Sequence, residues 1–134
     1  GWDTVKHEVF LKEIISELKR ARIRTSIFIE INPKHIENAV KTGTDRIEFY
    51  TESYAKNFSK NKEEAIKPFV ASAKLAGKLG LGLNAGHDLN LENLNYFHKH
   101  IPNLLEVSIG HALISDALYL GLENTVQLYL RQLK

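Results

Sequence analysis

The sequence contains no cysteine, and this absence excludes both a disulfide scaffold and a thiolate metal site. It also fits a reducing compartment, so we expect a cytoplasmic protein. Long apolar runs are missing as well, since none approaches the roughly 20 residues that a membrane-spanning helix needs. No signal peptide is apparent. We therefore expect no membrane partner.

Positive and negative charges are nearly balanced. The 134 residues include 18 basic and 16 acidic side chains, which gives a net charge of +2. The basic residues are scattered among acids, so the chain has no electrostatic basis for binding nucleic acid. With 43% hydrophobic and 25% charged residues, the composition is typical of a globular domain with a real core.

Methionine is also absent, and the sequence begins at Gly1. A start without Met is typical of processing, of a cloning remnant or of a fragment of a longer protein. No linker or low-complexity segment interrupts the chain. We interpret residues 1–134 as a single domain.

Extended and helical patterns alternate along the chain. Short extended patterns between the helical ones predict four strands, at residues 25–30, 46–51, 81–85 and 104–109, the first of which is rich in strand formers. Apolar residues at helical spacing predict helices before, between and after these strands, the first over residues 4–21. A polar loop is expected directly after the second strand.

Asparagines predict where three of the helices begin. Asn32 precedes Pro33, and Asn61 precedes Glu64 by three residues, patterns typical of a helix N-terminus. Asn90 is expected to cap a third helix.

Strands that alternate with helices predict parallel pairing through right-handed crossovers. Four such units fit either a small open doubly wound sheet or half of a TIM (β/α)8 barrel, which has about 250 residues when complete. Periodicity alone does not choose between them.

The most informative feature is a pair of similar strand ends. One strand runs into Gly86-His87-Asp88 and the next into Gly110-His111, and a helix follows each. Functional residues of parallel α/β folds gather at the carboxyl ends of strands. Glycine there lets a ligand approach the backbone, the next helix offers free N–H groups to an anion, and histidine exchanges protons near neutral pH. The structural alternative is that each glycine ends a strand and each histidine begins a helix.

Glu48 is a further candidate, because it stands between large apolar residues in the second strand. A carboxylate is costly to bury without a partner. Pointing into a barrel, it would stabilise a cation or move a proton; the alternative is that it pairs with a lysine at a helix end.

The other histidines, His7, His35, His98 and His100, lie in polar surroundings and are interpreted as surface residues. None has the spacing of a metal site. A P-loop, a dinucleotide fingerprint and a G-x-S-x-G elbow are also absent.

At these residues the sequence resembles the pyridoxine 5'-phosphate synthase family. The resemblance is carried by stretches similar to the family's strands five, six, seven and eight, namely Ser26–Glu30, Ile47–Thr51 with Tyr54-Ala55, Leu83–Leu89 with Asn93, and Glu106–Ile114. Order and intervals agree across essentially the whole chain.

The resemblance implies the C-terminal half of a (β/α)8 barrel that joins 3-amino-2-oxopropyl phosphate to 1-deoxy-D-xylulose 5-phosphate, giving pyridoxine 5'-phosphate, phosphate and water. It implies His87 as proton donor and Glu48 as the charged group that stabilises the transition state. Asp88, Gly110 and His111 would hold the aminoketone phosphate, largely through backbone groups. The resemblance implies no metal or organic cofactor. It also implies that the protein forms a homo-oligomer.

Family members are nearly twice as long, and their N-terminal half supplies a glutamate that serves as general base. We therefore expect that half to be needed for activity and to cover the sheet edges. Glu52 also departs from the family, which has glycine there. Two other hypotheses remain open: a non-catalytic phosphate-binding half-barrel, and a different barrel enzyme, for instance an isomerase.

Overall fold

Four parallel strands form the centre of the structure, a computed structural model that describes residues 1–134. The strands are β1 (Ser26–Ile29), β2 (Arg46–Phe49), β3 (Gly82–Ala85) and β4 (Leu104–Val107). They pair in the order β1-β2-β3-β4, with no reversal of the kind that marks a doubly wound sheet. The four predicted strands are confirmed, and their order is consistent with part of a (β/α)8 barrel.

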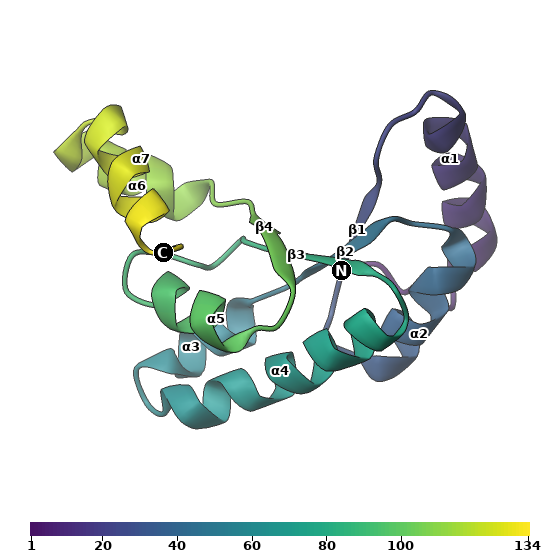
Figure 1. Cartoon of the computed structure of the whole chain (residues 1–134), viewed down its shortest axis with the longest axis horizontal. Coiled ribbons are helices and arrows are strands. Elements are labelled where there is room, and N and C mark those ends of the chain that lie inside the picture. The colour runs from purple at the N-terminus through teal and green to yellow at the C-terminus, as the bar shows by residue number, and fades with distance from the viewer.

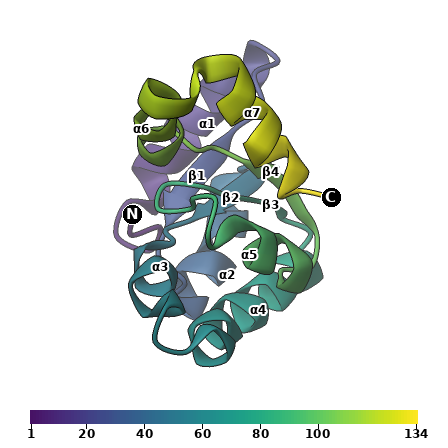
Figure 2. The same cartoon turned by 90° about the vertical axis from the view of Figure 1, so that its left-hand side faces the viewer.

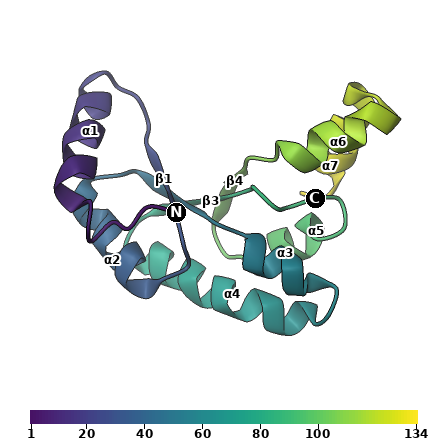
Figure 3. The same ribbon diagram turned by 180° about the vertical axis from the view of Figure 1, so that it is seen from behind.

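Helices surround one side of this sheet (Figure 1). They are α1 (Glu8–Arg20), α2 (Pro33–Thr42), α3 (Glu52–Phe58), α4 (Lys62–Lys78), α5 (Leu94–His100), α6 (His111–Leu120) and α7 (Leu122–Arg131). The helices α2 to α5 lie along one face, while α1 stands beside the β1 edge and α6 with α7 beside the β4 edge (Figures 1 and 3). Figure 2 shows α6 and α7 side by side above the sheet. None of the helices combines the length and the apolar character that a membrane span requires.

The core lies between the sheet and these helices. In β1 and β2 the residues alternate, so that Ile27, Ile29, Ile47 and Phe49 are buried against the helices. Four aromatic rings pack edge to face beneath the sheet, those of Phe49, Tyr54, Phe69 and Phe97. The opposite face carries half-buried side chains of the same strands, and no helix covers it (Figures 1 and 3).

Two of the predicted helix starts are confirmed. The side chain of Asn32 accepts a hydrogen bond from the N–H of Lys34, and that of Asn61 from the N–H of Glu64, both at 3.0 Å. Asn90 is different, because it accepts N–H groups within a turn and α5 begins only at Leu94.

Two other predictions about local structure were wrong. The expected polar loop after β2 is the helix α3, which the burial of Tyr54 and the Glu52–Lys56 pair stabilise. The first helix begins at Glu8, later than predicted, because the Asp3 carboxylate accepts the N–H groups of Val5 and Lys6 in a turn and the Thr4 hydroxyl donates to the distant His35 carbonyl. Burial of Tyr54 thus overrode the polar composition after β2, and side-chain bonds to the backbone overrode the apolar pattern before α1.

Candidate active site at the carboxyl ends of the strands

The sheet brings the two Gly-His segments together. β3 and β4 are neighbours, and their pairing continues past their ends, where the Ser108 N–H donates to the Ala85 carbonyl at 2.9 Å. Gly86-His87-Asp88 and Gly110-His111 therefore leave the same edge of the sheet side by side. The candidate residues of both segments therefore lie at one edge of the sheet.

The two glycines serve different purposes. A Cβ atom on Gly86 would lie 1.9 Å from the carbonyl oxygen of Ser108, so the missing side chain makes room for the neighbouring backbone. We had expected this space to admit a ligand, and at Gly86 that expectation was wrong. At Gly110 nothing lies within 4 Å of an added Cβ, so this backbone is open to a ligand.

His87 stands at the end of β3 with 59% of its side chain exposed. Its Nδ1 lies 3.1 Å from Oδ2 of Asp88. Its ring contacts Tyr50 edge to face, at 5.8 Å between centroids, and lies 6.4 Å from the ring of Phe28. Three residues from three different strand ends therefore surround the imidazole, and its Nε2 has no protein partner.

Glu48 lies on the uncovered face of β2, in register with Phe28 of β1 and Asn84 of β3. Partial burial raises the pKa of its carboxyl group, the Glu106 carboxylate raises it further, and His87 lowers it. The two predicted catalytic side chains, Glu48 and His87, are therefore close enough for their charges to interact.

A network of charged groups lies beside Glu48 on the same face. Glu106 accepts hydrogen bonds from Arg24 at 2.9 Å and from Arg46 at 3.0 Å, and Arg46 also donates to Asn84 Oδ1 at 3.0 Å. Sequence reasoning missed these residues. The signal was present, because polar residues recur at alternate positions of β2 and so share one face.

The second Gly-His segment begins α6. Gly110 is the residue before its first turn, and no side chain caps the free N–H groups there. The N–H of Asp88, in contrast, donates to the Thr51 hydroxyl at 3.3 Å. An anion at this edge would therefore find more unpaired donors at Gly110-His111 than at Asp88.

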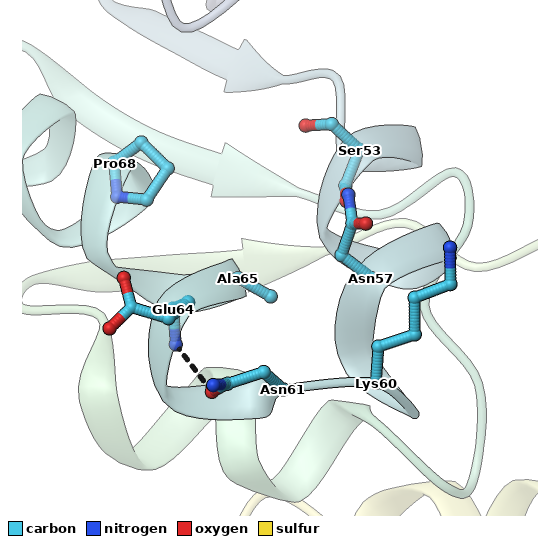
Figure 4. A pocket seen from close by; sticks show the side chains of 7 residues that line it. All are labelled: Ser53, Asn57, Lys60, Asn61, Glu64, Ala65 and Pro68. Carbon is cyan, nitrogen blue, oxygen red and sulfur yellow. Dashed lines mark hydrogen bonds between the residues drawn. The ribbon is translucent and has the colours of Figure 1, made fainter.

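Two features elsewhere do not belong to this site. His35, interpreted as a surface residue, is only 20% exposed and its Nδ1 is buried without a hydrogen-bond partner. A polar cavity of about 260 Å³ lies between α3 and α4, away from the strand ends (Figure 4). In it, Asn61 caps α4 through the N–H of Glu64, so this polar group already has a structural role. No group of three or more His, Asp or Glu side chains is arranged to hold a metal ion.

Comparisons with known proteins agree along the whole chain. A family model described as pyridoxal phosphate biosynthesis protein PdxJ matches residues 1–134. The chain is 61% identical over 134 residues to a "Pyridoxine 5'-phosphate synthase" of Christiangramia forsetii and 61% identical to one of Cytophaga hutchinsonii. A third such protein, of Flavobacterium johnsoniae, is 58% identical. Each comparison covers 100% of this chain and 56% of the relative, so the chain spans about half the length of the curated relatives it matches.

Proposed function

This chain belongs to the PdxJ family of pyridoxal phosphate biosynthesis proteins, and from that premise we propose that it forms strands five to eight of a pyridoxine 5'-phosphate synthase barrel. The enzyme would condense 3-amino-2-oxopropyl phosphate with 1-deoxy-D-xylulose 5-phosphate to pyridoxine 5'-phosphate. The observation that carries this proposal is the side-by-side exit of Gly86-His87-Asp88 and Gly110-His111 from β3 and β4, above Glu48.

His87 is the proposed proton donor. The Nε2 atom of its ring is free, and the exposed side chain lies at the edge where substrates of parallel α/β enzymes bind. Ring closure releases water, and a leaving hydroxyl needs a proton at that step. An imidazole suits this transfer because its ordinary pKa of about 6.5 is close to neutral pH.

Glu48 is the proposed electrostatic partner of the reaction. A carboxylate on the inner face of the sheet stabilises positive charge that develops on the nitrogen of the aminoketone. Arg24 and Arg46 bond to Glu106, whereas no cation bonds to Glu48, so the Glu48 carboxylate is available to a positive charge on the substrate.

Gly110 and His111 are proposed to bind the phosphate of the aminoketone. The open backbone at Gly110 and the uncapped first turn of α6 support this role. Asp88 would contribute through its backbone, since its carboxylate repels a phosphate, but less than Gly110-His111, because its N–H already donates to Thr51. The remaining part of the barrel would supply the general base and cover the outer edges of β1 and β4, each of which has one neighbour in the sheet. We also propose that the complete enzyme is a homo-oligomer that needs no metal or organic cofactor.

The test requires a complete barrel. We define the composite protein as this chain joined to the segment of the Christiangramia forsetii relative that it does not cover. Incubated with both phosphorylated substrates, it should form pyridoxine 5'-phosphate and release phosphate. In it, His87→Ala should lower kcat by about 10²–10⁴-fold with KM nearly unchanged, because the proposed substrate contacts are elsewhere.

His100→Ala is the matched control, since His100 is exposed on α5 and bonds only to the carbonyl of Tyr96. Near-normal turnover of the His87→Ala variant would contradict the assignment of the proton donor. A composite protein that binds phosphate but forms no product would instead support the non-catalytic half-barrel.

A further inference from the structure

Asp88 presents a contradiction within the proposed site. A carboxylate next to a phosphate is repulsive, yet Asp88 is one of the residues proposed to hold the phosphorylated substrate. The structure shows where this side chain lies: its Oδ2 is 3.1 Å from Nδ1 of His87, and it is 28% exposed. The negative charge of Asp88 is thus directed at the imidazole of the proposed proton donor.

Buried side chains hold Asp88 in this place. Its N–H donates to Oγ1 of Thr51 at 3.3 Å, and its carbonyl accepts from Nδ2 of Asn93 at 3.3 Å. Thr51 is fully buried and Asn93 is 3% exposed. Because the backbone of Asp88 is held from both sides, its side chain leaves the chain at a fixed point beside His87.

Two aromatic rings also lie against the imidazole. The rings of Tyr50 and Phe28 pack on each other at 5.4 Å, and both contact His87. Of the two ring nitrogens, Nδ1 is engaged by Asp88 and Nε2 is not engaged by the protein. A carboxylate at one ring nitrogen fixes the proton there, and so leaves the other nitrogen for chemistry.

We propose that Asp88 is a positioning residue, whose carboxylate accepts the Nδ1–H of His87 and thereby leaves Nε2 to exchange a proton with the substrate. The inference rests on the proposed function and adds to it a role for the Asp88 side chain. In this arrangement the backbone at Gly110-His111 binds phosphate, while the Asp88 side chain serves the proton donor.

Nitrogen-15 NMR of the composite protein tests the geometry without any turnover. The His87 ring signals, assigned by their loss in His87→Gln, should show a proton on Nδ1 of the neutral ring. Asp88→Ala should abolish this preference, and Asp88→Asn should retain it in part, because the amide oxygen still accepts a hydrogen bond. Glu52→Gln is the control for charge alone, since Glu52 lies near His87 but its carboxylate bonds to Lys56 and Tyr50 and not to the imidazole, and glutamine keeps an acceptor oxygen for Tyr50.

Kinetics test the consequence. Asp88→Ala should lower kcat by roughly 10–100-fold, as loss of an orienting partner of a histidine does. KM should stay nearly unchanged, Asp88→Asn should recover part of kcat, and Glu52→Gln should match the wild type. An active composite protein in which Asp88→Ala changes neither the nitrogen signals nor kcat would overturn the proposed role of Asp88. A composite protein without turnover would refute the proposed function itself, so the two failures are distinguishable.

Discussion

Replacing Gly86 with alanine should separate the ends of β3 and β4. The added Cβ would lie 1.9 Å from the Ser108 oxygen and 2.7 Å from its carbonyl carbon, both backbone atoms. Ordinary contact begins at 3.4 Å, so the strand ends must move apart by about 1.5 Å, the difference between 3.4 and 1.9 Å. A backbone clash cannot be relieved by a change of rotamer.

The cost follows from what this movement breaks. Forcing extra volume into a packed site costs about 1–3 kcal/mol. The bond from the Ser108 N–H to the Ala85 carbonyl, 2.9 Å long, would also be lost or lengthened, which costs about 1 kcal/mol more. We therefore expect Gly86→Ala to lower the free energy of unfolding by about 2–4 kcal/mol.

Urea unfolding of the composite protein measures this loss, and Gly77→Ala is the matched control. A Cβ on Gly77 would meet only the end of the Asn103 side chain, at 3.3 Å, within helix α4. Since alanine favours a helix over glycine, this control should be neutral or stabilising by up to about 1 kcal/mol. If both variants unfold within about 0.5 kcal/mol of the wild type, the reasoning about the strand ends is wrong.

Two further predictions concern Glu48 and Tyr54. Burial, with the Glu106 carboxylate, raises the pKa of Glu48, so its contribution to stability is present at low pH and is lost as the pH rises through that pKa. The stability of the wild type relative to Glu48→Gln should therefore fall as the pH rises above the ordinary glutamate pKa, and urea midpoints with no such trend would contradict this. Tyr54→Phe should lower the free energy of unfolding by about 1–2 kcal/mol, because the Tyr54 hydroxyl donates to the buried Asn93 carbonyl at 2.8 Å. Thermal unfolding checks this against Tyr119→Phe, whose ring is 88% exposed and which should not differ from the wild type.

The sequence by itself determined the elements whose signals are local. Runs of β-branched and aromatic residues placed β1 and β2, short apolar runs between helical patterns placed β3 and β4, and the asparagines before α2 and α4 marked where those helices begin. Both signals act between residues that are at most a few positions apart, so no tertiary information is needed to see them. The repeated Gly-His motif, together with the strand stretches around it, likewise identified the family.

Only the tertiary structure decided which side chains meet at that edge. Glycine at position 86 is required by Ser108, more than 20 residues away, and not by a ligand. The Asp88–His87 contact depends on Thr51 and Asn93, which hold the backbone of Asp88 from other segments. The electrostatic surroundings of Glu48 depend on the strand register, which places it beside groups of β3 and β4. Register and packing arise from contacts between distant segments, and a pattern read along one segment contains no information about its partners.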